Sequence, residues 1–312
     1  LYILTMSVLS QSTVANKISF SGIGIHTGKL ANINILPAQP NSGIIFKRVD
    51  LKKNNVVIPN FENVSEATLC TTICNQFGVK VSTIEHLMAA FLSLGIDNVL
   101  VETDSQEIPI LDGSAKDFIK LLKDAGSKKS DVPIKLIKID NYVEIVEQNK
   151  FISIDKSNTK LEIEFEISYD NQIIKTQKNK INVYEDKLDE VLNSRTFCLY
   201  EDIEKLKKLG LGKGGSLENA IVVMNDKILN KNGLRNNNEF VNHKILDCMG
   251  DLYLTGYRLI GSIKCKHGGH SLTNKLLRKV FSDTRNYSLI EIKGKSLPHS
   301  LVNNRHNLKS IA

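Results

Sequence analysis

Tryptophan is missing from this chain of 312 residues, and aromatic residues make up only 6% of it. Proteins that bind single-stranded nucleic acids stack bases on aromatic side chains, so this composition argues against such a partner. The formal net charge is +7, but the lysines are dispersed among asparagines and isoleucines and form no basic stripe. We therefore expect no nucleic-acid partner. A mildly basic surface still favours approach to an anionic substrate or a membrane face.

Long apolar runs are also missing. No stretch approaches the roughly 18 residues needed to span a bilayer, and the most apolar segment, residues 87–94, is short enough to be one helix face. The first residues lack a basic n-region and a small-residue cleavage site, which argues against a signal peptide, and Met6 is a candidate natural start. We expect a soluble, cytoplasmic protein.

Only five cysteines are present, an odd number without a paired C-x-x-C spacing. A chain of this length buries enough apolar surface to fold without disulfides, so the cysteine usage indicates a reducing compartment. Cys70 and Cys74 resemble half of a zinc site, but no second cysteine or histidine pair lies at the required spacing. We therefore expect buried structural thiols.

The first part of the chain reads as strands up to residue 51, separated by glycine, proline and asparagine turns. Residues 82–94 then place apolar side chains at helical spacing, with Ser82 as the expected N-cap and Gly95 as the stop. A buried strand over residues 98–103 and a helix over residues 114–125 follow. Strands, helix, strand and helix therefore succeed one another.

The same order returns in the second part of the chain. Polar residues 127–133 predict a boundary between an N-terminal domain, 1–129, and a C-terminal domain, 130–312. Apolar residues alternate with glutamates over 161–167, as in a half-buried strand. Further elements are expected at residues 199–210 (helix), 220–224 (strand), 239–251 (helix), 258–265 (strand) and 271–281 (helix). This predicts an α+β fold of two similar domains, each with a β-sheet packed on helices, and an active site in the cleft between them.

The segment EFVNHKILDCMGD, residues 239–251, places three polar groups along one side of a helix. His243, Asp247 and Asp251 follow one another at four-residue intervals, about one turn apart. A histidine and an aspartate so spaced suit a divalent metal, although a solvated ion pair on an exposed face has the same spacing. Asp251 lies in an otherwise apolar helix, where a carboxylate needs a cation or a hydrogen-bond donor.

A catalytic zinc normally has three protein ligands, so a third must come from elsewhere in the chain. His86 in STIEHLMAAF is the candidate, and Glu85 beside it could take a proton from water. The pair Ser82 and Glu85 also fits a capping box, in which the glutamate points back along its own helix. A general base would instead face the metal, so the structure separates the two interpretations.

Two further segments supply polar groups. His270 in HGGHSLTNK precedes a helix and is a candidate acid or oxyanion donor, or a loop histidine without a role. Thr196 in NSRTF offers a hydroxyl. The glycine-rich GLGKGGS lacks the phosphate-loop spacing and follows a helix, so we expect a flexible connection there. His26 in GIGIHTG is expected to be structural.

Several long motifs together carry a family resemblance. They are TLCTTI at 68–73, STIEHLMAA at 82–90, GIDNVLVE at 95–102, EIPILDGSA at 107–115, SRTF at 194–197, HKILDCMGDL at 243–252 and GGHSLTNKLL at 268–277. In this order, over about residues 7–281, the sequence resembles the UDP-3-O-acyl-N-acetylglucosamine deacetylases. These are zinc amidases at the committed step of lipid A synthesis in Gram-negative bacteria. The residues after Phe281 match no part of the pattern.

The resemblance implies a set of catalytic roles. One Zn²⁺ per chain would be held by His86, His243 and Asp247, and the resemblance leaves Fe²⁺ open as the metal in the cell. Glu85 would be the general base. His270, kept protonated by Asp251, would stabilise the oxyanion and protonate the leaving amine, and Thr196 would assist at the carbonyl oxygen.

The resemblance also implies how substrate binds. The substrate, an acylated UDP-sugar, would contact Lys244 and Phe197, and Cys70 would lie near the metal without being an essential ligand. An insert over about residues 197–223 would line an acyl-chain passage, with Leu206 and Leu211 among its wall residues, together with Ile203 and Leu209.

One position departs from the family. Where a basic residue is expected three positions before the catalytic histidine, this chain has His267, with Lys266 adjacent, so the contacts to the diphosphate are left open. We expect a monomer that contacts the inner membrane only transiently. The alternative function is a non-catalytic binder of nucleotide-sugar lipids with the same fold.

Overall fold

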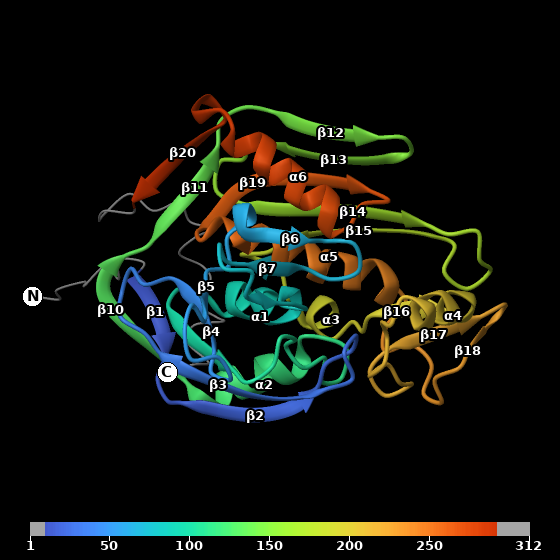
Figure 1. Cartoon of the computed structure of the whole chain (residues 1–312). Helices are drawn as coiled ribbons and strands as arrows, with labels where there is room; N and C mark the ends of the chain where they lie inside the picture. The colour runs from blue at the N-terminus through green and yellow to red at the C-terminus, as the bar shows by residue number, and fades with distance from the viewer. Residues whose placement is uncertain (1–9, 292–312) are drawn as a thin grey trace, which may run out of the picture.

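The computed structural model describes residues 10–291, so the expected start at Met6 and the last 21 residues lie outside the described part. The first half contains a five-stranded sheet covered by two helices (Figure 1). In order across the sheet, its strands are β2 (Ile18–Ile23), β3 (Leu30–Pro37), β9 (Val99–Thr103), β4 (Ile44–Arg48) and β5 (Val56–Val57). The helices are α1 (Glu85–Leu94) and α2 (Lys116–Ala125).

The second half contains a seven-stranded sheet with its own pair of helices. Five of its strands are β12 (Val143–Glu147), β13 (Lys150–Asp155), β19 (Arg258–Lys266), β14 (Leu161–Ser168) and β15 (Thr176–Asn182). The other two, β11 (Lys135–Ile139) and β20 (Tyr287–Glu291), pair with each other, and β11 also joins the start of β19. The helices are α5 (Glu239–Leu252) and α6 (His270–Phe281).

The two sheets repeat one topology, which confirms the predicted pair of similar α+β units. β2-β3-β9-β4-β5 and β12-β13-β19-β14-β15 have the same order. Within these two sets of five strands, the pairs β4–β9 and β14–β19 are parallel, and all other neighbouring strands are antiparallel. The helix that precedes the central strand is α1 in one half and α5 in the other. These two helices therefore occupy equivalent places in the repeat.

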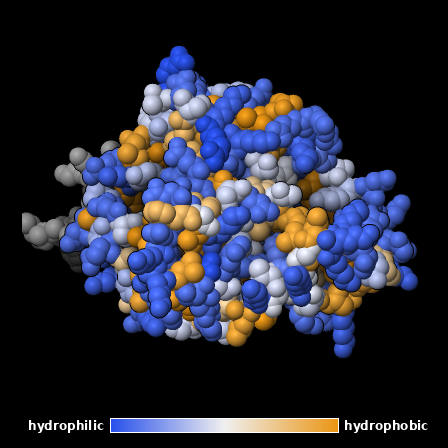
Figure 2. All heavy atoms as spheres, viewed as in Figure 1, coloured by the Kyte–Doolittle hydropathy of each residue, from blue (hydrophilic) through white to orange (hydrophobic). Residues whose placement is uncertain are grey.

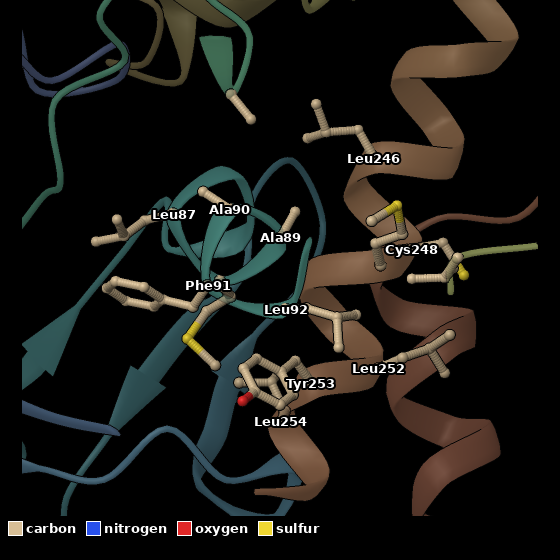
Figure 3. Close-up of a cluster of buried hydrophobic side chains, with 14 of the residues drawn as sticks. Leu87, Ala89, Ala90, Phe91, Leu92, Leu246, Cys248, Leu252, Tyr253 and Leu254 are labelled. Atoms are coloured by element: carbon tan, nitrogen blue, oxygen red, sulfur yellow. The ribbon is translucent and has the colours of Figure 1, made fainter. Parts of the chain in front are cut away.

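Helices α1 and α5 pack against each other between the two sheets (Figure 1). Figure 3 shows Ala89 and Leu92 of α1 on the side of α5, whereas Leu87 and Phe91 point away from it. Gly250 of α5 allows the closest approach, because a Cβ atom built there would lie 2.0 Å from the carbonyl oxygen of Glu85. Only a glycine fits at this crossing, since Cβ atoms do not approach backbone so closely.

Smaller elements complete the described chain. β1 (Ser10–Val14) pairs with β10 (Ser127–Pro133), and a small sheet consists of β6 (Val64–Glu66), β7 (Thr72–Cys74) and β8 (Lys80–Val81). There are also a short helix, α3 (Asp189–Leu192), and the 3₁₀ turns η1 (Phe61–Asn63), η2 (Tyr253–Thr255) and η3 (Thr284–Asn286). An outlying unit consists of β16 (Phe197–Leu199), α4 (Tyr200–Lys208), β17 (Ile221–Met224) and β18 (Lys227–Ile228). The outlying unit contains the predicted insert.

Two expectations about connecting segments need correction. Residues 127–133 form a strand that pairs antiparallel with β1, although their polar composition resembled a linker. The division at residues 129 and 130 remains a prediction. The glycine-rich segment is also held in place, because the backbone N–H of Gly214 donates to the carbonyl of Ile25 (3.0 Å), and that of Lys213 to the carbonyl of His26 (3.3 Å). Both segments gain partners from distant parts of the chain.

Replacing Gly250 with alanine tests the close approach of α1 and α5. Alanine normally stabilises a helix interior by about 0.5–1 kcal/mol relative to glycine. Here we expect the opposite sign, a loss of about 1–3 kcal/mol in the free energy of unfolding, because the added methyl group overpacks the crossing. Urea denaturation measures this change.

Gly215→Ala is the matched control. Gly215 is exposed, and the nearest atom to a Cβ there is the carbonyl oxygen of Gly212 at 3.2 Å. We expect its free energy of unfolding to stay within about 0.5 kcal/mol of the parent value. A Gly250→Ala protein as stable as this control would show that the crossing tolerates a side chain.

Candidate active site

Three buried side chains converge where α1 meets α5. His86 is the second residue of α1, and His243 and Asp247 lie one turn apart on α5. Nε2 of each histidine lies 3.4 Å from Oδ1 of Asp247, and one ligand atom from each residue lies within 4.8 Å of the others. This is the one such group found in residues 10–291. It could hold a metal ion.

The chemistry of these side chains fits a metal. Among the described residues, Oδ1 of Asp247 has no hydrogen-bond partner although it is buried, which is costly for a carboxylate oxygen. Nδ1 of His243 lies 3.1 Å from the carbonyl oxygen of Ser194, so it carries the proton and leaves a lone pair on Nε2. Burial lowers the pKa of His243 to about 3, which keeps the ring neutral. Neutral imidazole and carboxylate are ligands that zinc prefers.

Lys244 neighbours the same carboxylate. Its Nζ donates to Oδ2 of Asp247 at 2.8 Å. Burial alone would raise the pKa of Asp247, but the neighbouring positive charges of Lys244 and His270 outweigh burial and hold it well below its usual value. Oδ2 is therefore paired with a cation, while Oδ1 faces the two histidines.

Glu85 faces this group and not its own helix. The backbone N–H of Thr71 donates to Oε2 of Glu85 (3.1 Å), and Oε1 lies 3.7 Å from Nε2 of His270. None of the described side chains caps the first turn of α1, and the hydroxyl of Ser82 donates to the carbonyl of Gln106. The prediction of Ser82 as N-cap is therefore wrong, and so is the capping-box interpretation. Burial raises the pKa of Glu85.

His270, the first residue of α6, pairs with Asp251. Its Nδ1 lies 2.7 Å from Oδ2 of Asp251, and both side chains are buried. Burial by itself lowers the pKa of His270, but the charges of Asp251, Asp247 and Glu85 outweigh it and raise the pKa to about 10. The buried imidazole is therefore protonated at neutral pH. This meets the need for a partner that the sequence predicted for Asp251.

The remaining predicted residues surround this centre. The ring of Phe197 stands edge-on to that of His243, with centroids 6.4 Å apart. Thr196 precedes β16, and its backbone N–H donates to the carbonyl of Gly113. Cys70 is buried, and burial followed by the charge of Glu85 raises the pKa of its thiol to about 12. All five cysteines are free thiols, and Cys70 is buried as expected, whereas Cys74 is only partly buried.

The outlying unit carries Leu206 and Leu211, and both are half-buried. The backbone N–H of Leu211 donates to the carbonyl of Leu206, which folds the end of α4 back on itself. Leu209, by contrast, is 70% exposed. In the view of Figure 2, hydrophobic residues gather beside this unit, while most of the visible surface is hydrophilic.

The residues in doubt for the diphosphate lie at the end of β19. Lys266 pairs with Glu166 at 3.1 Å, and His267 has a positive φ of 52°. None of the helices in the described part is both long and apolar enough to cross a membrane.

Sequence reasoning missed the residues that hold the site in place. Thr71 contacts both Glu85 and Asp251, and its hydroxyl donates to Oδ1 of Asp251 at 2.5 Å. Glu239 is fully buried and accepts hydrogen bonds from the backbone and guanidinium of Arg195. Thr71 lies inside the TLCTTI motif, but nothing in the local spacing says what it contacts.

A buried His-His-Asp group beside a carboxylate and a charged histidine is the arrangement of a metal-dependent hydrolase. Comparison with known sequences agrees with the assignment as a hydrolase. Residues 11–282 match the family model described as LpxC, UDP-3-O-acyl N-acetylglycosamine deacetylase. The chain therefore belongs to the UDP-3-O-acyl-N-acetylglucosamine deacetylase family.

Curated relatives extend the similarity over nearly the whole chain. The sequence is 38% identical to a UDP-3-O-acyl-N-acetylglucosamine deacetylase of Actinobacillus pleuropneumoniae serotype 3 over 291 residues, which covers 92% of this chain and 95% of that protein. An enzyme of the same name from Haemophilus influenzae (strain PittEE) is 39% identical, over 92% of this chain and 95% of its own length. Another from Pseudoalteromonas translucida is 40% identical, over 88% of this chain and 91% of its own length.

Glu239→Ala tests whether the buried Glu239–Arg195 ion pair helps to position His243. The change leaves the buried guanidinium of Arg195 without its carboxylate, and breaking a buried ion pair in this way costs about 3–5 kcal/mol. We expect a loss of that size in the free energy of unfolding, measured in urea. Because Arg195 adjoins the Ser194 carbonyl that orients His243, we also expect metal affinity to fall about 10- to 100-fold.

The control removes an exposed ion pair. Lys120 and Asp124 pair at 2.8 Å on the surface of α2, with side chains 74% and 64% exposed. Lys120→Ala should leave stability and metal affinity unchanged, since such pairs contribute little. If Glu239→Ala behaved like Lys120→Ala, the buried pair would not support the site.

Proposed function

We propose that this chain hydrolyses the N-acetyl group of UDP-3-O-acyl-N-acetylglucosamine, giving the free amine and acetate, in lipid A biosynthesis. Family membership supports the reaction and the substrate. The observation that carries the proposal is the convergence of Glu85, His270 and the His86, His243 and Asp247 group in one buried place. A non-catalytic nucleotide-sugar lipid binder would have no need for a complete set of acid, base and metal ligands.

His86, His243 and Asp247 would hold a single Zn²⁺, with Fe²⁺ as the other metal that such ligands accept. When bound, the ion supplies a Lewis acid that polarises a carbonyl oxygen and lowers the pKa of water to about 7. The ligands themselves are prepared for this, because His243 is neutral and already oriented by the Ser194 carbonyl.

Glu85 would accept a proton from the attacking water. A general base works best when its pKa lies near the operating pH, and burial shifts the pKa of Glu85 upwards, in that direction. Its Oε2 is occupied by the Thr71 N–H, so Oε1 is the oxygen free to take the proton. The side chain cannot serve its own helix as a cap at the same time.

His270 would act from the other side of the reacting carbonyl. Held positive by Asp251, it can donate to the developing oxyanion and then to the leaving amine. The Thr196 hydroxyl would assist at the same oxygen. Loss of one such donor typically costs about 2.7–4 kcal/mol, a rate decrease of about 100- to 1,000-fold.

Substrate binding would use the surroundings of the site. Lys244 and Phe197 would contact the sugar, and Leu206 and Leu211 of the outlying unit would border the acyl chain. We expect the enzyme to work in the cytoplasm as a monomer, with transient contact to the inner membrane, where its amphiphilic substrate is used.

Variants at Asp247 and Glu85 separate metal binding from proton transfer. We expect Asp247→Ala to lose the metal, because it removes the one anionic ligand. Glu85→Ala should keep the metal and lose about 100- to 10,000-fold in kcat, the usual contribution of a well-placed base. Elemental analysis of the purified proteins and an assay of acetate release from the acylated UDP-sugar give the two readouts.

The parent protein treated with a chelator is the reference for metal loss, and activity should return with added Zn²⁺. Retention of the metal by Asp247→Ala would contradict its assignment as a ligand. Release of the metal by Glu85→Ala, or turnover at the parent rate, would remove Glu85 from the role of base.

Shortening the acyl chain of the substrate tests the outlying unit. Each buried CH₂ contributes about 0.8 kcal/mol, so every methylene removed should weaken binding about fourfold. Leu206→Ser should weaken this dependence on chain length, whereas Lys207→Ser, at a 64% exposed position of the same helix, should leave it unchanged. Calorimetric titration of the Glu85→Ala protein with substrates of decreasing length measures the affinities, and equal values would exclude an acyl site.

A further inference from the structure

Thr71 connects the two halves of the site. It lies directly before β7 in the first half, and its side chain is 1% exposed. Its backbone N–H donates to Oε2 of Glu85 (3.1 Å), and its hydroxyl donates to Oδ1 of Asp251 (2.5 Å), which is 180 residues further along the chain. Thr71 therefore bonds to two carboxylates, that of Glu85 in α1 and that of Asp251 in α5.

The two contacts share a pattern. Thr71 occupies one oxygen of each carboxylate and leaves the other oxygen facing His270. Oε1 of Glu85 lies 3.7 Å from Nε2 of the imidazole, and Oδ2 of Asp251 lies 2.7 Å from Nδ1. The imidazole thus lies between two carboxylates, and Thr71 bonds to the oxygen of each carboxylate that does not face the imidazole.

The bonds to Thr71 limit rotation of the Glu85 and Asp251 carboxylates about their terminal torsions. The terminal torsions of Asp and Glu are broad, so packing alone does not fix which oxygen faces the imidazole. Without the Thr71 hydroxyl, Oδ1 of Asp251 would be a buried acceptor that lacks a partner, and the carboxylate would turn to recover one. Such a turn would move the imidazole with it, because the 2.7 Å contact follows the carboxylate.

We infer that Thr71 is a positioning residue that sets the mutual geometry of Glu85 and the Asp251–His270 pair. It acts through these side chains and not on the substrate, so its loss lowers the rate of the chemical step and leaves substrate affinity intact. The inference rests on the proposed function, because it concerns the groups that would transfer protons in that reaction.

Thr71→Val is the decisive variant, because valine keeps the shape and the backbone N–H but removes the hydroxyl. Misplacing catalytic groups by about 1 Å can cost about 100-fold in rate, so we expect kcat to fall about 10- to 100-fold. KM should stay within about twofold, and the metal content should equal that of the parent. Thr71→Ser restores the hydroxyl and should recover kcat to within about threefold of the parent.

The matched control is Thr103→Val in β9. Thr103 is also a fully buried threonine, and its hydroxyl donates to the carbonyl of Ser105 in its own loop, away from the site. It should keep the parent kcat. The inference is overturned if Thr71→Val keeps the parent kcat, with or without a higher KM, or if it loses metal. It is also overturned if Thr71→Ser is as slow as Thr71→Val.

A second measurement does not depend on turnover. Thr71→Val, Asp251→Ala and the double variant form a cycle whose unfolding midpoints in urea are compared. If the hydroxyl bonds to the carboxylate, the double variant should shift the midpoint by less than the two single shifts together, and additive shifts would overturn the inference. If the parent protein releases no acetate, the proposed function fails, and this cycle still decides whether Thr71 couples the halves.

Discussion

The crossing of α1 and α5 is the constraint on which the rest of the structure depends. At Gly250 the two helices approach until a side chain no longer fits against the carbonyl of Glu85. This contact places His86 of one half within reach of His243 and Asp247 of the other. Neither half carries a full set of ligands, so the site exists only when both halves fold and their equivalent helices meet.

The crossing also concentrates charge in a buried place. The carboxylates of Glu85, Asp247 and Asp251 lie there, and among residues 10–291 the cations that contact them are Lys244 and His270. Burial of such groups is unfavourable unless each finds a partner. The carboxylates outnumber the cations, and Oδ1 of Asp247 is left without a donor in the described residues. A divalent cation between the two histidines would offset this imbalance, so the electrostatics and the ligand geometry favour the same occupant.

The repeated topology explains how such a site arises. In both halves the helix before the central strand lies on the inner face of its sheet, and the two copies face each other. The two halves differ in the polar groups that these equivalent helices carry and in the elements that accompany the repeat. Thr71 comes from the loop before β7, and each half carries a small three-stranded sheet before its inner helix, β6-β7-β8 in the first half and β16-β17-β18 in the second. The helices of the repeat thus carry the acidic and histidine side chains of the site, and the loop with Thr71 adds contacts that hold two of them.

Local sequence patterns were enough to predict the main helices and several core strands, and they placed three polar groups of the candidate site on one helix. Spacing of four residues places His243, Asp247 and Asp251 on one helix side, and alternation marks β14, because both patterns depend only on local backbone geometry. Three features depend on long-range contacts instead: Glu85 turns towards the site and not to the N-terminus of its own helix, residues 127–133 form a strand, and Thr71 bridges the halves. Each of these depends on a partner far away in the chain, and no local pattern encodes which distant segment will be there.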